Sequence, residues 1–231
     1  KIFQIYVRGD AGWLDELIRR AIEHGYTAIC FTVDLDTFGR RERDIAKRYL
    51  TTARRAASGE EHQARFTWDD VERIGKKFDI PLILKGIATP GDAARAVDIG
   101  ISAVYVSNHG GRQLDHVLGS TDMLPEIAEK VAGRAEIIVD GGYMRGSDIV
   151  KAIALGADAV GLGQLQGLAA AAGGEDAIVR MLEILEQELK HCLMLLGVAS
   201  FSELDPSFVT RVAPLQNNWL DSAFPLLKEG Y

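Results

Sequence analysis

The chain has 231 residues, of which 47% are hydrophobic and 26% charged, and its net charge is −7. This length and composition predict a soluble α/β protein of one large domain or at most two small ones, and they exclude a disordered chain, a collagen-like fibre and a bundle of membrane helices. The acidic balance gives no bulk attraction for nucleic acid or an anionic membrane, so locally placed arginines must hold any anionic ligand.

The ends and the cysteines of the chain carry a few further expectations. The chain begins at Lys1 inside an apolar run and shows no secretory leader. We therefore expect a cytoplasmic protein whose sequence is N-terminally incomplete. Cys30 and Cys192 lie far apart in apolar segments and are expected to be buried, reduced thiols. With no paired cysteines and no cysteine–histidine cluster, no metal site is predicted.

Short apolar segments alternate with helical ones along the chain. The expected strands are 3–7, 27–33, 81–85, 103–107, 136–139 and 159–162. The expected helices, each apolar on one face, are 11–24, 68–78, 89–99, 122–131, 147–155 and 176–196. A polar excursion at 35–65 lies within one βα connection, and Thr67 after it is the expected N-cap of a helix. The tail 201–231 is irregular, with one short helix expected near Ser202.

The pattern of strands predicts the fold class. Continuous apolar strands are typical of parallel strands buried on both faces, and repeated βα units form either an open doubly wound sheet or a (β/α)8 barrel. Polar residues follow the strands at Asp34, Lys85, Asn108, Asp140 and Gly163. In a barrel, these strand ends converge on one face. We therefore predict a single-domain (β/α)8 TIM barrel over 1–231, with its first two βα units absent from this chain.

A nine-residue polar string, SNHGGRQLD at 107–115, directly follows a predicted strand. It places His109 beside two glycines, which allow close approach to a ligand, and Arg112 three residues later. Histidine is the natural base near neutral pH, and an arginine offers a fixed fork to a carboxylate. A single histidine after a strand is more often structural, but this setting predicts a catalytic one.

Two glycine-rich turns follow the last two predicted strands. Asp140, Gly141 and Gly142 precede a helix, and Gly163 and Gln164 follow the final strand. Turns at these places in a barrel hold phosphate groups on their backbone N–H groups. Together they indicate a phosphorylated cofactor.

Two basic features leave alternatives open. The cluster GRRERD at 39–44 is either a solvated, self-paired surface or part of the site. Lys85 ends a buried strand, where it either extends its amine to solvent or stabilises developing negative charge.

The string at 107–115 resembles the signature of the FMN-dependent 2-hydroxy-acid oxidase and dehydrogenase family, which includes glycolate oxidase, lactate oxidase and mandelate dehydrogenase. The resemblance extends through the segments 3–7, 32–34, 39–42, 84–86, 140–142 and 151–157. It implies a barrel that binds FMN and oxidises an L-2-hydroxy acid to the 2-oxo acid. It also implies O2, a quinone or a cytochrome as the electron acceptor and a homo-oligomer, commonly a homotetramer.

The same resemblance implies roles for single residues. His109 is expected to be the catalytic base, Asp34 its orienting partner and Tyr6 the tyrosine beside the substrate hydroxyl. Arg112 and Arg41 are expected to bind the substrate carboxylate. The implied FMN contacts are Gln4, Thr32, Lys85 and Ser107 at the flavin ring, and Asp140, Gly141, Gly142, Arg145, Gly163 and Gln164 at the ribityl chain and phosphate.

Two positions depart from the family pattern. Met144 and Gln164 stand where the family usually has arginines that contact the FMN phosphate. Losing two charge-assisted contacts of roughly 1.5–3 kcal/mol each would weaken FMN binding by about two to four decades. Backbone donors or Arg145 are expected to restore part of this lost affinity. One alternative is therefore an FMN-poor or non-catalytic barrel that acts as a binding protein. Another is a flavin-dependent isomerase of a diphosphate, against which the histidine and its two arginines argue.

Overall fold

The computed structural model describes residues 1–37, 39, 46–48, 60–114 and 116–212 of the protein. Six parallel strands form one sheet in the order in which they occur in the chain. They are β1 (Ile2–Ile5), β2 (Ala28–Thr32), β3 (Leu82–Ile87), β4 (Ala103–Val106), β5 (Glu136–Asp140) and β6 (Ala159–Gly161). The six predicted strands are confirmed. Their sequential order differs from that of a doubly wound sheet, which reverses at a switch point.

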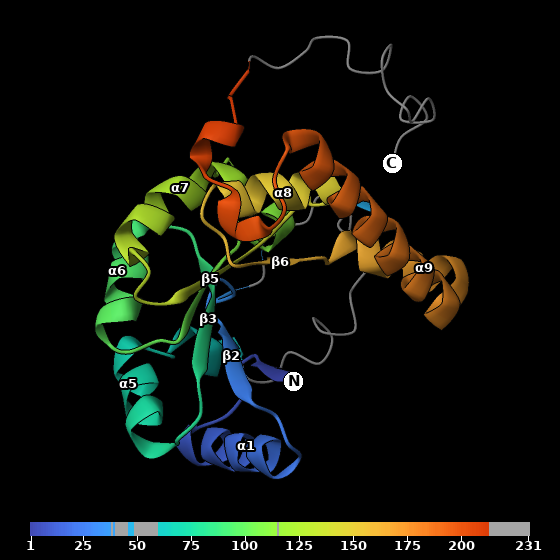
Figure 1. Ribbon diagram of the computed structural model, residues 1–231. Coiled ribbons are helices and arrows are strands. Elements are labelled where there is room, and N and C mark those ends of the chain that lie inside the picture. Colours follow the sequence, from blue (N-terminus) through green and yellow to red (C-terminus); the bar gives the residue numbers. More distant parts are fainter. Residues whose placement is uncertain (38, 40–45, 49–59, 115, 213–231) are drawn as a thin grey trace.

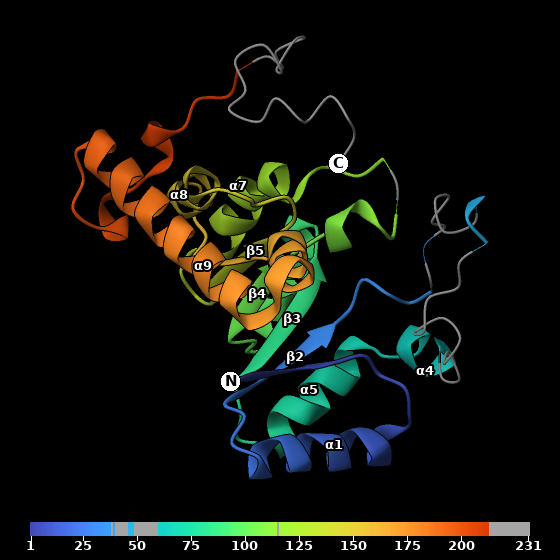
Figure 2. The ribbon, with the colours of Figure 1, turned by 90° about the vertical axis from the view of Figure 1, so that its right-hand side faces the viewer.

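Helices cover the convex face of the curled sheet and form an arc around it (Figure 1). They are α1 (Ala11–Glu23), α5 (Trp68–Lys77), α6 (Pro90–Asp98), α7 (Ser120–Val131), α8 (Gly146–Ala154) and α9 (Gln164–Leu196). The short helix α4 (Glu60–Ala64) precedes α5, and the 3-10 turns are η1 (His109–Gly111), η2 (Phe201–Glu203) and η3 (Pro206–Phe208). Figure 2 shows α9 running beside α8. The six βα units thus form a half-barrel.

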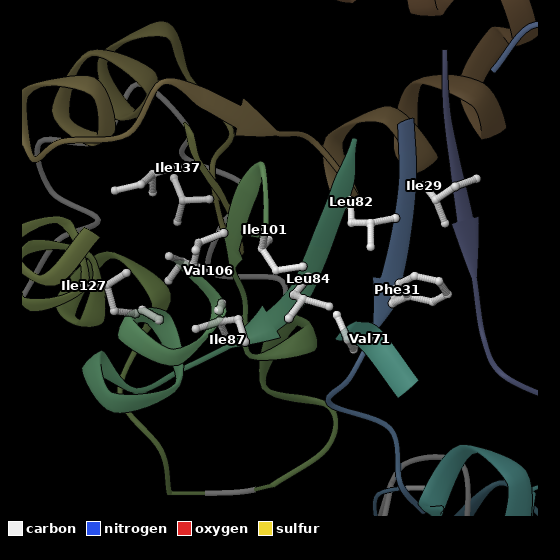
Figure 3. Packing of buried hydrophobic residues seen from close by; sticks show 14 of the residues in the cluster. Ile29, Phe31, Val71, Leu82, Leu84, Ile87, Ile101, Val106, Ile127 and Ile137 are labelled. Atoms are coloured by element: carbon white, nitrogen blue, oxygen red, sulfur yellow. The ribbon is translucent and has the colours of Figure 1, made fainter. Parts of the chain in front are cut away.

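The main hydrophobic core lies between the sheet and its helices (Figure 3). Phe31 of β2 and Leu84 of β3 point into it and meet helix residues such as Val71 of α5. Each such buried side chain contributes about 1.5–3 kcal/mol. A smaller cluster on the other face comprises Ala28, Cys30, Ile83 and Ala103, with Tyr105 and Ile138 packed against it. Burial on both faces explains why the strands are continuous apolar runs rather than alternating ones.

Side chains cap two of the helix starts, and Thr67 is the N-cap that the sequence predicts. Thr67 and Asp70 form a reciprocal capping box at the start of α5. Thr89 Oγ1 accepts a hydrogen bond from the Asp92 N–H at 3.1 Å at the start of α6. Such caps are worth about 1 kcal/mol each and fix where the chain turns from strand to helix.

Several boundaries differ from the prediction. Strand β1 ends at Ile5 rather than at residue 7, because a side chain takes the next backbone N–H, as described below. Helix α9 begins at Gln164 rather than at residue 176, and the chain bends within it at Gly173 and Gly174. These two glycines interrupt the helical pattern, which explains why only the second half was predicted.

Three further comparisons concern the polar excursion, the C-terminal tail and the cysteines. Helix α4 lies inside the excursion 35–65, for which no helix was predicted. The short helix expected near Ser202 is confirmed by η2. Both cysteines are free, as expected, although Cys192 is only half-buried. Within the described ranges, no helix is long and apolar enough to cross a membrane, and no three His, Cys, Asp or Glu side chains are grouped to bind a metal.

Candidate active site

The carboxyl ends of the six strands meet at one edge of the half-barrel, because all strands are parallel. Tyr6 follows β1, Asp34 follows β2 and Lys85 lies near the end of β3. His109 begins the turn after β4, and Asp140 ends β5. The structure therefore brings residues predicted from five separate segments to the same edge.

A histidine–aspartate pair forms the centre of this edge. His109 Nδ1 lies 3.0 Å from Asp34 Oδ1, and the two side chains are 20% and 11% exposed. The second oxygen, Asp34 Oδ2, is buried without a hydrogen-bond partner among the described residues. Among the described side chains, the imidazole of His109 is therefore the hydrogen-bond partner of this carboxylate. The carboxylate favours the tautomer that carries the proton on Nδ1 and leaves Nε2 able to accept one.

The backbone at His109 has an unfavourable conformation, and contacts with neighbouring residues hold it in place. His109 has a φ of 57°, which is left-handed and costs a non-glycine residue of order 1–3 kcal/mol. Its N–H donates to Ser107 Oγ at 3.1 Å, which holds the turn. Gly86 of β3 has a φ of 107°, and a Cβ atom there would lie 2.6 Å from Asp34 Cβ. Only glycine lets β3 pass this close to Asp34.

A buried lysine lies beside the pair. Lys85 Nζ is 2.9 Å from Asp140 Oδ2 and 2.8 Å from Ser107 Oγ, and Ser107 donates in turn to Asp140 Oδ1 at 2.5 Å. The amine also lies 4.8 Å from the centre of the Tyr105 ring. Lys85 is 9% exposed and Ser107 fully buried. The amine therefore does not extend to solvent, and it forms a fixed positive charge at the base of the site.

The concave face between β1 and β2 carries the next group of predicted residues. Gln4 Nε2 donates to Thr32 Oγ1 at 2.6 Å and reaches the Tyr6 hydroxyl at 3.5 Å. Burial raises the pKa of the neighbouring Cys30 thiol to about 12, so this thiol is neutral near pH 7. Polar contacts on this face therefore come from the amide and the two hydroxyls.

One residue of the polar string has a structural role that the sequence reasoning missed. Gln113 Nε2 donates to the carbonyls of Asp34 and Thr37 at 3.2 and 3.3 Å, and Gln113 Oε1 accepts from the Gly39 N–H at 3.4 Å. The loop after β2 is thereby fixed against the loop after β4. The position of Gln113 in the string was visible, but nothing in the sequence showed which backbone it binds.

The predicted carboxylate-binding residues are only partly described. Arg112 lies in the loop after β4 and its side chain is exposed. A Cβ atom on Gly39 would lie 2.5 Å from the Arg112 carbonyl oxygen, so Gly39 lies directly against the backbone of the loop after β4. Arg41 itself and Asp115 lie outside the described residues.

The phosphate end of the site consists largely of backbone. Gly141 and Gly142 have φ values of 107° and 85°. Helix α9 starts at Gln164 after Gly163, and none of the described side chains caps its N-terminus. A Cβ atom on Gly142 or Gly163 would meet nothing within 4 Å, so both stretches of backbone are approachable. An uncapped helix N-terminus attracts an anion such as a phosphate.

The start of α8 is different, because carboxylates already occupy it. Asp148 Oδ2 accepts from the N–H groups of Met144 and Arg145, both at 3.0 Å. Glu188 of α9 accepts from the Gly146 N–H at 2.7 Å and pairs with Arg145 Nη2 at 2.6 Å. Burial alone would raise the pKa of Glu188, but the bonds from Arg145 and Gly146 outweigh it and lower that pKa. The guanidinium predicted to contact the phosphate therefore has a carboxylate partner.

Comparisons with known proteins agree with this arrangement. The family model described as FMN-dependent dehydrogenase matches residues 1–211. L-lactate oxidase from Nostoc sp. is 40% identical over 90% of this chain and 63% of that protein. L-lactate dehydrogenase (cytochrome) from Saccharomyces cerevisiae is 35% identical over 90% of this chain and 39% of that protein. A crystal structure of mandelate oxidase with benzoyl-formic acid has a TM-score of 0.79 at 43% identity, over 87% of this chain and 60% of that chain.

The fold is a parallel half-barrel whose carboxyl edge carries a histidine–aspartate pair and a buried lysine. The chain belongs to the FMN-dependent dehydrogenase family, and FMN is the cofactor of that family. It spans about three-fifths of the length of the lactate oxidase. The residues present fit FMN, since a buried cation, a polar concave face and an uncapped helix N-terminus are available for the ring and the phosphate.

Proposed function

We propose that this protein oxidises an L-2-hydroxy acid to the 2-oxo acid with FMN. The observation that carries the proposal is the His109–Asp34 pair, with 3.0 Å between Nδ1 and Oδ1, at the same edge as the buried Lys85. Relatives named for the oxidation of lactate and mandelate support the substrate class.

In the proposed mechanism, the chain's own residues bind the acid and move a proton. Oxidation of the alcohol carbon removes two electrons and two protons. Arg112 and Arg41 bind the carboxylate, and His109 Nε2 accepts one proton from the substrate. Asp34 stabilises the imidazolium that results. FMN, when bound, would take up the electron pair and the remaining proton.

Lys85 and Tyr6 complete the proposed roles. Lys85 is held by Asp140 and Ser107, so its charge is in place before the reaction and stabilises negative charge on the reduced cofactor. The Tyr6 hydroxyl, which Gln4 reaches, is proposed to bind the substrate hydroxyl. The phosphate is proposed to bind at the glycine backbone and the start of α9.

The complete protein is proposed to be larger than the half-barrel. Strands β1 and β6 are the two edges of the sheet, and two further βα units would close it into a (β/α)8 barrel. A homo-oligomer and a cytoplasmic location remain predictions. The electron acceptor is proposed to be O2, as the name of the lactate oxidase indicates, or a cytochrome, as that of the yeast enzyme does, with a quinone as the third choice.

A panel of 2-hydroxy acids tests the proposal. The purified flavin-loaded protein is assayed with both configurations of each acid, with O2 and with a dye as alternative acceptors. The expected result is consumption of at least one L-acid with equimolar 2-oxo acid. A protein that retains its flavin and turns over none of the acids with either acceptor contradicts the proposal.

A further inference from the structure

Strands β1 and β2 separate just before β1 reaches the site. Their pairing ends at Ile5 and Phe31. The Val33 N–H donates to the Lys85 carbonyl on β3, so the Thr32 carbonyl, on the opposite side of the same peptide, faces β1. The next rung of the ladder would therefore join the Val7 N–H directly to the Thr32 carbonyl, at about 2.9 Å.

A side chain occupies that rung instead. The Val7 N–H donates to Gln63 Oε1 at 2.7 Å, and Gln63 Nε2 donates to the Thr32 carbonyl at 2.9 Å. Gln63 is 5% exposed. A carboxamide offers the same donor and acceptor as a peptide unit. It therefore continues the ladder while holding the two strands apart by its own width.

The position of Gln63 is itself fixed by the core. It lies in α4, and the Phe66 N–H donates to its carbonyl at 3.1 Å, closing a turn before α5. The Phe66 ring packs on Phe31 of β2, with 5.1 Å between ring centres, and Phe31 is fully buried. The inserted carboxamide is thus anchored to the same strand that it holds away from β1.

We propose that Gln63 is a positioning residue that sets the place of Tyr6 relative to Thr32. This inference rests on the proposed function, which gives Tyr6 its role beside the substrate hydroxyl. Tyr6 immediately precedes Val7, and Gln4 contacts both Tyr6 and Thr32. Without the carboxamide, direct pairing would draw Tyr6 toward β2, or two buried backbone groups would lose their partner. Either change displaces the hydroxyl that is proposed to meet the substrate.

The first test needs no substrate. In Gln63→Glu, a protonated carboxyl can accept from Val7 and donate to Thr32 as the carboxamide does, whereas an ionised one faces a carbonyl oxygen. Burial and that carbonyl favour the protonated form, so the pKa of the introduced carboxyl is raised on folding. Its unfolding temperature should fall below that of wild type at neutral pH and approach it as the pH is lowered through that pKa. If the difference in unfolding temperature between this variant and wild type does not depend on pH, Gln63 does not form the inserted rung.

The second test separates positioning from general stability. Gln63→Leu keeps much of the volume and removes both hydrogen bonds, and kcat/KM for the hydroxy acid should fall by roughly 10- to 100-fold with flavin retained. In a Tyr6→Phe background, the same change should cost less than about threefold, because Gln63 acts through Tyr6. If Gln63→Leu lowers kcat/KM by the same factor in the Tyr6→Phe background as in wild type, the positioning role is overturned.

A control and the wild type complete the design. Gln187 is exposed on α9, so Gln187→Glu and Gln187→Leu should match wild type in the pH dependence of unfolding and in kcat/KM. A wild type that oxidises no 2-hydroxy acid contradicts the proposed function. The pH rescue of Gln63→Glu still decides whether the carboxamide forms the rung.

Discussion

The two ends of the candidate site are held in place by different means. At the substrate end, side chains bind one another: Asp34 holds His109, and Asp140 holds Lys85. At the phosphate end, backbone N–H groups predominate, and the guanidinium of Arg145 is paired with Glu188. Side-chain contacts can fix a reacting atom to within a few tenths of an ångström, whereas anion binding by backbone needs only approachable glycines. Chemistry and cofactor retention should therefore respond to separate substitutions.

The largest expected effect is at the substrate end. His109→Gln removes the base but leaves the flavin contacts at other strand ends in place. Turnover should fall by ~10²–10⁴-fold, while the flavin spectrum of the purified protein is kept. Steady-state assays and the flavin-to-protein ratio measure both. A variant that keeps more than about a tenth of wild-type kcat contradicts the role of His109.

Gly86→Ala tests how tightly Asp34 is placed. The new methyl group would lie 2.6 Å from Asp34 Cβ at a φ of 107°, so the Asp34 carboxylate must move away from His109. We expect a loss of about 1–3 kcal/mol in unfolding free energy and roughly 100-fold in kcat.

Gly91→Ala is the matched control for this change. A Cβ atom at Gly91, within α6, meets nothing closer than Thr89 Oγ1 at 3.9 Å. The control should be as stable as wild type or up to about 1 kcal/mol more stable, because alanine favours a helix. If Gly86→Ala behaves like this control, the close approach to Asp34 does not matter.

Arg112→Lys should damage catalysis although the charge is kept. A single ammonium does not reproduce the two parallel hydrogen bonds of a guanidinium with a carboxylate. We expect KM to rise and kcat/KM to fall by roughly 10-fold or more, since a misoriented acid reacts slowly. Initial rates over a range of acid concentrations give both constants. Unchanged kinetics with every acid that wild type accepts would remove Arg112 from the site.

Much of the scaffold follows from the sequence because its signals are local. Continuous apolar runs at β2 and β3 indicate buried parallel strands, and the Thr67 side chain marks the start of α5. His109 and Asp34 both follow strands, and parallel strands bring their carboxyl ends together, whereas the resemblance to the family implied that Asp34 is the partner of His109.

What the sequence did not reveal depends on contacts between distant residues. Gln63 lies in a polar stretch without helical period, and only the fold shows that its carboxamide meets Val7 and Thr32. The pairing of Arg145 with Glu188 likewise joins two helices. The early start of α9 was missed because glycines at 167, 173 and 174 weaken the helical pattern.

The smallest expected effect sharpens the comparison at the phosphate end. Gln164→Arg adds a guanidinium at the first residue of α9, and FMN should bind more tightly by up to ~1.5–3 kcal/mol if the new group reaches the phosphate. Met144→Arg should act in the same direction, and the two gains need not add because both act on one phosphate. Titration of the apoprotein with FMN measures each. Nanomolar binding in wild type that neither arginine improves would show that other residues hold the phosphate.

Anaerobic reduction of the bound flavin tests the proposed function most directly. The flavin-loaded wild type is mixed without O2 or dye with an L-2-hydroxy acid that it turns over, and separately with the 3-hydroxy isomer of the same acid. The proposed function predicts that the 2-hydroxy acid bleaches the flavin absorbance with formation of one 2-oxo acid per flavin. The isomer, whose alcohol carbon is not next to the carboxylate, should leave the flavin oxidised. A flavin that stays oxidised with every 2-hydroxy acid, or that both isomers bleach at equal rates, would contradict the proposed function.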